Sequence, residues 1–239
     1  MGDEYAETVR LLWEPQPKPA RGPRPTLDLD RIARAGVQIA DWDGLSELSM
    51  RRVAERLGVT KMALYRYVPG KAELIALMID AAIGPYPTAE QVRGDWREQL
   101  EDWARRLFVG FRQHPWVLEA TVGPRVMGPG ELSWLERAVS ALDGTGLTGA
   151  ERMDTAVLLL GHLRGIVAQQ AGTAGSGDNP EAQLGAILGG LMQEHGAQFP
   201  ALASAFASAV QSDGQDHAWE FGLQRILDGL AALIDQRAR

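Results

Sequence analysis

Cysteine is absent from the 239 residues, which excludes a disulfide framework, a thiolate metal site and a cysteine nucleophile. Histidine is scarce, and the four present stand far apart, none in the HExxH spacing of a zinc enzyme: His114, His162, His195 and His217. The GxSxG motif of a serine nucleophile is missing, and no glycine pair follows a strand-to-helix pattern that would hold phosphate. We therefore expect no enzymatic activity, no metal and no cofactor.

Long apolar runs are also missing. The longest, residues 156–168, is interrupted by His162 and Arg164 and is too short to cross a bilayer. The first ten residues, MGDEYAETVR, are acidic and lack the charged and then apolar run of a secretory signal. These features predict a cytoplasmic protein without a membrane partner.

No segment shows the strict apolar and polar alternation of a β-strand, although 45% of the residues are apolar and 23% charged, as in ordinary globular proteins. Helical periodicity recurs instead between proline and glycine breakers such as Gly123-Pro124 and Asp143-Gly144. The pattern predicts an all-α fold with helices at about 28–41, 50–57, 61–68, 71–82, 96–113, 131–142, 148–170, 181–194, 199–210 and 219–236.

Negative charge prevails over the chain as a whole, but its first 71 residues are net positive. The net charge is −7, yet residues 1–71 hold 12 of the 24 Lys and Arg against 10 of the 31 Asp and Glu, so they are net positive. The remainder of the chain is strongly acidic. A basic front and an acidic body suit a protein that approaches nucleic acid with one face.

The stretch from Ser46 to Lys71 has the pattern of a helix-turn-helix. Ser49 is a good N-cap for a first helix, Gly58 supplies a C-terminal stop, and Thr60 caps a second helix only two residues later. The side chains left facing outward mix cations, phenols and small apolar groups, which suits phosphates, guanine edges and thymine methyl groups. A merely solvated basic helix pair would show much of the same pattern.

The run LSMRRVAERLGVTKMALYRYVPGKAELIALMIDAAIG resembles the DNA-binding domain of the tetracycline-repressor (TetR) family, with Tyr65, Tyr67 and the Pro69-Gly70-Lys71 turn where that pattern expects them. The resemblance implies phosphate contacts from Arg51 and Lys71, and base contacts from the second helix. Together with the caps and two arginines ahead of the domain, the predicted DNA-binding residues are Arg21, Arg24, Ser49, Met50, Arg51, Thr60, Lys61, Met62, Ala63, Tyr65, Arg66, Tyr67 and Lys71.

Three parts follow from these patterns. Residues 1–25 contain five prolines and are predicted to form a flexible basic arm, either a disordered tail or an arm that follows the DNA backbone. Residues 26–84 form the helix-turn-helix domain with its connecting helix. Residues 85–239 resemble the C-terminal ligand-binding and dimerisation domain of tetracycline repressors, on the segments RQHPWVLEAT and LDGTGLTGAE.

Two helices of the predicted body carry small and aliphatic stripes that fit a homodimer face. The first, residues 148–170, has Val157, Leu160, Gly161, Arg164 and Ala168; the second, residues 219–236, has Leu223, Ile226, Leu227, Leu230 and Leu233. Both stripes also fit a helix that faces its own core. A dimer is favoured because two recognition helices must contact successive turns of DNA.

The body is rich in aromatic residues, which suits an apolar cavity for a small-molecule effector as well as an ordinary core. The predicted cavity residues are Trp103, Phe111, His114, Trp116, Trp134, His162, Arg164 and Gln169. The sequence thus indicates a regulator, of repressor type by resemblance, that binds a palindromic double-stranded DNA operator and is released by an effector. The alternatives are a DNA-binding protein without an effector, and a helical enzyme or carrier in which the helix-turn-helix is incidental.

Overall fold

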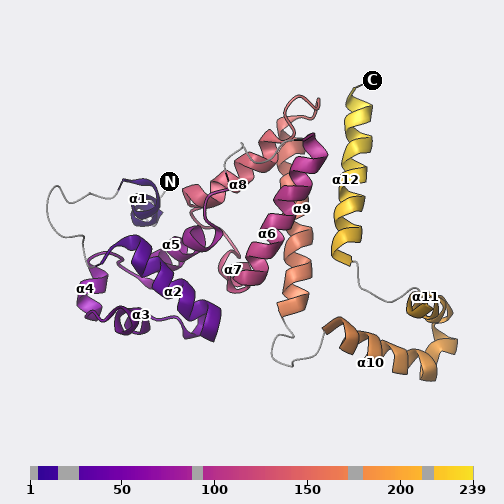
Figure 1. Cartoon of the computed structure of the whole chain (residues 1–239), viewed down its shortest axis with the longest axis horizontal. Helices are drawn as coiled ribbons and strands as arrows, with labels where there is room; N and C mark the ends of the chain where they lie inside the picture. The colour runs from indigo at the N-terminus through magenta and orange to yellow at the C-terminus, as the bar shows by residue number, and fades with distance from the viewer. Residues whose placement is uncertain (1–4, 16–26, 88–93, 172–179, 212–217, 239) are drawn as a thin grey trace.

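The computed structural model describes residues 5–15, 27–87, 94–171, 180–211 and 218–238. Throughout these ranges the regular structure is helical, and no strand occurs among the described residues. The all-α fold class predicted from the sequence is confirmed. Figure 1 shows the N-terminal helices gathered on one side, the helices of the body in the middle, and the last long helix on the other side.

The N-terminal unit consists of α2 (Leu29–Asp43), α3 (Met50–Leu57), α4 (Lys61–Tyr65) and α5 (Lys71–Ile83), with a 3-10 turn η2 at Leu45–Glu47. Asp28 caps α2, because its carboxylate accepts a hydrogen bond from the backbone N–H of Arg31 at 2.8 Å. The helices α2 and α5 approach closely at Gly36, where a β-carbon would lie only 2.5 Å from the sulfur of Met78. Apolar side chains from all four helices and the intervening turn fill the core between them: Ile32, Leu48, Val53, Leu64, Leu74 and Met78.

A short helix, α1 (Ala6–Trp13), precedes this unit and packs on α5. The prediction of a flexible arm for residues 1–25 is therefore wrong for this segment. The prolines begin only at Pro15, so nothing prevents helix formation before them, and Leu11 gains burial against the unit. The indole N–H of Trp13 also donates to the carbonyl of Met127, 3.1 Å away in the body.

The body begins with α6 (Trp96–Gln113), α7 (Trp116–Ala120), α8 (Pro129–Ser140) and α9 (Gly149–Ala171). A chain reversal through α10 (Pro180–His195), the 3-10 turn η4 (Gly196–Gln198) and α11 (Pro200–Gln211) then leads to α12 (Ala218–Arg237), which packs along α9. Figure 1 shows α10 and α11 set apart from the other helices, with α12 returning beside α9.

The core of the body lies between α6, α8, α9 and α12, where fully buried leucines meet: Leu100, Leu142, Leu159, Leu163, Leu223 and Leu227. Truncating one of these leucines to alanine is expected to cost about 2–5 kcal/mol. The close packing fixes the positions of α6, α8 and α9, which form most of the wall of the cavity described below.

Candidate DNA-binding surface and ligand cavity

Caps at three points fix the helix-turn-helix. The hydroxyl of Ser49 accepts from the backbone N–H of Arg52 at 3.2 Å, and that of Thr60 accepts from the N–H of Ala63 at 3.2 Å. Gly58 ends α3 in the left-handed conformation, at φ 67°, which side chains with a β-carbon adopt only with strain. The angle between α3 and α4 is therefore set by local hydrogen bonds that the sequence specifies directly.

The outward side of α4 and the turn after it forms one exposed strip, which we call the recognition surface: Lys61, Met62, Tyr65, Arg66 and Tyr67. Met62 is 73% exposed, and the ammonium group of Lys61 lies 5.4 Å from the ring centroid of Tyr65. In the part of the chain that the structure describes, Lys61 and Arg66 form no ion pair, and neither does Lys71 beside them. Their charges are free to meet phosphates or base edges.

The remaining predicted DNA contacts divide into three groups. Arg51 is exposed, and its 3.7 Å contact with Glu55 is a surface pair of about 0–1 kcal/mol that leaves the guanidinium available. Ala63 is half-buried. Met50 is only 6% exposed and packs in the core, so the prediction that its side chain contacts DNA is wrong; the apolar phase of α3 turns it inward together with Val53. Arg21 and Arg24 lie outside the described residues.

A cavity of about 420 Å³ opens in the body among α5, α6, α8, α9 and the segment between α7 and α8. Of the eight predicted cavity residues, four line it: Trp103, Phe111, Trp134 and Arg164. The other lining residues are Ile83, Leu107, Thr121, Val122, Arg125, Met127, Glu131, Leu135, Met153, Ala156, Val157 and Leu160. A volume of this size suits a small organic molecule, since ligand pockets measure about 300–1,000 Å³.

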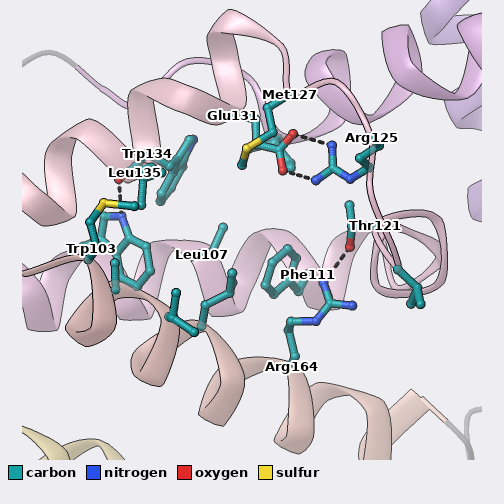
Figure 2. Close-up of a pocket in the computed structure, with 16 residues that line it drawn as sticks. Trp103, Leu107, Phe111, Thr121, Arg125, Met127, Glu131, Trp134, Leu135 and Arg164 are labelled. Atoms are coloured by element: carbon teal, nitrogen blue, oxygen red, sulfur yellow. Dashed lines mark hydrogen bonds and ion pairs between the residues drawn. The ribbon is translucent and has the colours of Figure 1, made fainter. Parts of the chain in front are cut away.

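The cavity has an aromatic end and a polar end. In Figure 2, Trp103, Trp134 and Leu135 lie together at one side, whereas Arg125, Glu131, Thr121 and Arg164 lie at the other. Arg125 donates from both terminal nitrogens to the two carboxylate oxygens of Glu131. Arg164 donates to the hydroxyl of Thr121 and to the carbonyl of Leu118, each at 2.6 Å. Burial, together with the nearby charge of Arg125, lowers the pKa of Arg164.

The other four predicted cavity residues lie outside this lining, and three of them are placed by tertiary contacts that the sequence does not reveal. His114 and Trp116 bind the same carboxylate oxygen of Asp41 on α2, each at 2.7 Å. His162 stacks on Trp219 of α12, with ring centroids 5.5 Å apart, and Gln169 is exposed. The prediction that these four line the central cavity is wrong.

The sequence pattern does not identify four lining residues near or in the loop between α7 and α8, because no aromatic helix carries them: Thr121, Arg125, Met127 and Glu131. The signal that could have identified them is the pairing of Arg125 with Glu131 across the glycine and proline breaker at 128–130. Opposite charges six residues apart across a turn meet readily once the turn closes.

The wall of the cavity is bonded to α5 at the junction between the two units. Asp80, on α5, accepts from the backbone N–H of Glu131 at 3.2 Å, at the first turn of α8. The indole N–H of Trp134 donates to the carbonyl of Gly84 at 3.0 Å, at the end of α5. Burial raises the pKa of Asp80, although the backbone hydrogen bonds oppose the shift. Two residues of the cavity wall, Glu131 and Trp134, are thus bonded directly to the helix that carries the DNA-binding unit.

The predicted dimer stripes are partly turned inward. Leu223, Leu227 and Leu230 of α12 are buried in the chain's own core, which corrects their assignment to an intermolecular face, and Leu160 and Arg164 of α9 line the cavity. The strip of α9 that is exposed at helical spacing keeps two residues of the predicted stripe, Gly161 and Ala168, and adds Leu158 and Gly165. No atom lies within 4 Å of a β-carbon built on either glycine, so this strip is open to a partner.

Two family models match the chain. Residues 32–78 match the model of bacterial regulatory proteins of the tetR family, and residues 87–234 match the tetracyclin repressor-like C-terminal domain. The chain belongs to the TetR family. The resemblance inferred from the recognition helix and the body is therefore confirmed, and the protein is a transcriptional regulator.

The similarity to other TetR proteins covers nearly the whole chain. The HTH-type transcriptional repressor DrrR1 of Streptomyces coeruleorubidus is 38% identical over 98% of this chain and 88% of its own length. The structure of apo ActR from Streptomyces coelicolor has a TM-score of 0.75 at 26% identity, over 90% of this chain and 99% of that one. ActR in complex with actinorhodin has a TM-score of 0.74 at 27% identity, over 86% and 96%.

Two negative findings concern the described residues alone. None of their helices combines the length and the apolar character needed to span a bilayer. Within the same residues, no group of three or more His, Asp or Glu is arranged to hold a metal ion.

Proposed function

We propose that the chain is a dimeric repressor that binds a palindromic operator through α4 and releases it when a small molecule fills the central cavity. The observation that carries this proposal is the direct bonding of cavity residues to α5, the helix that joins the two units. Repression as the direction of control is supported by the relative DrrR1, which is named a repressor.

At the DNA, the recognition surface enters the major groove. Lys61 and Arg66 donate to base edges, while Met62 and Ala63 offer apolar contact to thymine methyl groups. Arg51, Lys71 and the phenol hydroxyls of Tyr65 and Tyr67 bind phosphates, and the capped helix starts at Ser49 and Thr60 set the distance to the backbone. The absence of carboxylate partners at Lys61, Arg66 and Lys71 within the described structure supports these roles.

Dimerisation proceeds through the outer faces of α9 and α12. Leu158 is 56% exposed, and the glycines at 161 and 165 allow a helix of a second copy to approach closely. Phe221 of α12, 63% exposed, offers a second large apolar side chain for this contact. Burying these side chains between two copies would remove from water an apolar surface that a monomer leaves exposed.

Coupling between the two sites is a population shift. A ligand beside Glu131 and Trp134 favours one position of α8, and Asp80 and Gly84 carry that preference to α5. The distance between the two recognition helices of the dimer then no longer matches the distance between successive major grooves. A coupling free energy of about 1–3 kcal/mol is typical of such regulators.

The experiment that tests the proposal is a selection from random DNA duplexes with the purified full chain at moderate salt, followed by sequencing of the retained duplexes. We expect a palindrome with half-sites about one helical turn, 34–36 Å, apart. Retention of DNA at low salt only, with no enriched sequence, would contradict operator binding.

A further inference from the structure

The charges around the central cavity do not balance. Three ionised side chains line it: Arg125, Glu131 and Arg164. Arg125 and Glu131 neutralise each other through paired hydrogen bonds, which use both oxygens of the carboxylate. The charge of Arg164 is left over, so the lining carries one net positive charge.

Arg164 is held in place by neutral groups only. Its two terminal nitrogens donate to the hydroxyl of Thr121 and to the carbonyl of Leu118, near the end of α7. No Asp or Glu among the described residues forms an ion pair with it, although Arg164 also lines, together with Glu119, a separate and more open hollow on the outer side of α9. Leaving a half-buried cation without a counter-ion is costly, and an anion in the cavity would remove that cost.

The opposite end of the cavity offers aromatic surface without free hydrogen-bond donors. The indole N–H of Trp103 donates to the carbonyl of Trp134 at 2.8 Å, and the indole N–H of Trp134 donates to the carbonyl of Gly84. Both indoles therefore present carbon surface, as does Phe111 between the two ends (Figure 2). Such walls favour flat rings, through edge and stacking contacts.

We propose that the central cavity takes a flat aromatic monoanion, with fused rings against the wall that Trp103, Trp134 and Phe111 form and a carboxylate or equally acidic group paired with Arg164. This inference rests on the proposed function, in which the cavity is the effector site. It adds the charge of the effector, its orientation and the residue that selects it. The ligand carboxylate neutralises Arg164, as the carboxylate of Glu131 neutralises Arg125.

The test compares three anthraquinones that differ only in one substituent: a carboxylate, the neutral carboxamide, and an aminomethyl group that is cationic at neutral pH. Their dissociation constants for the full chain are measured by isothermal titration calorimetry. We expect the carboxylate to bind about tenfold to a hundredfold more tightly than the carboxamide, as one charge-assisted contact provides, and the cation to bind most weakly.

Variants locate the effect. Arg164→Gln should remove the preference for the carboxylate, and Arg164→Lys should keep part of it, because it retains the charge without the forked geometry. Arg112→Gln is the matched control: it removes the same charge from the exposed face of α6, outside the lining, and should keep the full preference. Circular dichroism establishes that each variant is folded.

Each remaining outcome overturns the inference. Equal binding of carboxylate and carboxamide to the wild-type chain would remove the role of the charge, and tighter binding of the cation would reverse it. Failure of all three compounds to bind would rule out the flat-ring ligand class. Operator selection is independent of these titrations, so a chain that selects a palindrome but fails them retains the proposed function and loses only this ligand assignment.

Discussion

Arg66 and Lys71 are both exposed cations near the end of the recognition surface, but they stand in different relations to the duplex. Arg66 follows α4 directly, whereas Lys71 begins α5 after the Pro69-Gly70 turn. Replacing Arg66 with alanine should relax sequence preference at one or two operator positions, at about 1–3 kcal/mol. Repeating the duplex selection with this variant checks the result, and an unchanged preference would contradict base contact by Arg66.

Lys71→Ala is the natural comparison, because a phosphate contact carries no sequence information. This variant should weaken binding to all duplexes alike and reduce the slope of log affinity against log salt by about one unit. Titrations of selected and scrambled duplexes at several salt concentrations measure both quantities. A loss confined to the selected duplex would place Lys71 at a base instead.

The contribution of Glu151 to the stability of the fold depends on pH. Its carboxylate accepts from the backbone N–H of Thr148 at 2.8 Å and pairs with Arg237 at the end of α12, and these contacts lower its pKa from 4.5 to about 2. A lowered folded pKa stabilises the fold above pH 4.5, and the contribution disappears as pH falls toward about 2.

Glu151→Gln removes that contribution. Denaturant unfolding of wild type and variant should show the largest difference above pH 4.5 and a shrinking difference below it. A difference that stays constant with pH would show that the carboxylate charge is not the stabilising feature.

At the scale of elements, the contact between α5 and α8 depends on two glycines, because a side chain at either position would clash with α5. A β-carbon on Gly128 would lie 2.1 Å from a carboxylate oxygen of Asp80, and one on Gly130 would lie 3.1 Å from the backbone carbon of Gly84. Gly128→Ala should therefore push Asp80 away from the first turn of α8 and destabilise the chain by about 1–3 kcal/mol.

Gly149→Ala is the control for that variant, since no atom lies within 4 Å of a β-carbon at the start of α9. Replacing glycine there should leave stability unchanged or raise it by up to about 1 kcal/mol, because alanine favours the helix. Thermal unfolding of both variants provides the comparison. Equal effects would show that α8 does not depend on the close approach of Asp80.

The exposed strip of α9, which includes Leu158, predicts that the chain forms a dimer through this helix. Leu158→Glu should convert a dimer to a monomer, because it places a charge in the apolar centre of the proposed contact. Trp42→Glu is the matched control, since Trp42 is an exposed apolar residue, 84% accessible, on α2. Sedimentation of both variants measures the oligomeric state, and a dimeric Leu158→Glu variant would place the interface elsewhere.

At the scale of the whole molecule, the sequence predicts what is decided locally. Ser49, Gly58 and Thr60 fix the helix-turn-helix through hydrogen bonds and dihedral angles within a few residues of each cap. The cavity is decided by packing between distant segments: His162 faces Trp219, 57 residues later, and Trp116 turns to Asp41, 75 residues earlier. Helix phase alone does not distinguish such a partner from a cavity, so only four of the eight residues predicted from the sequence, Trp103, Phe111, Trp134 and Arg164, line the cavity.

The same limit applies to α1 and to the α12 stripe. The proline-rich composition of residues 1–25 hid a short amphipathic helix, α1, which buries Leu11 and packs against α5; so short a helix depends on tertiary packing. Leu223 and Leu227 are apolar at helical spacing, which fits an internal and an external contact equally until the neighbouring α9 is in place.

The central claim is that two copies of the chain hold two recognition helices on one operator. The most direct measurement is the affinity and stoichiometry of binding to the selected duplex, compared with a duplex of equal length in which one half-site is scrambled. We predict two chains per intact duplex and a loss of about a hundredfold or more in affinity when one half-site is lost. One chain per duplex, with half-sites bound independently and equally well, would contradict the account.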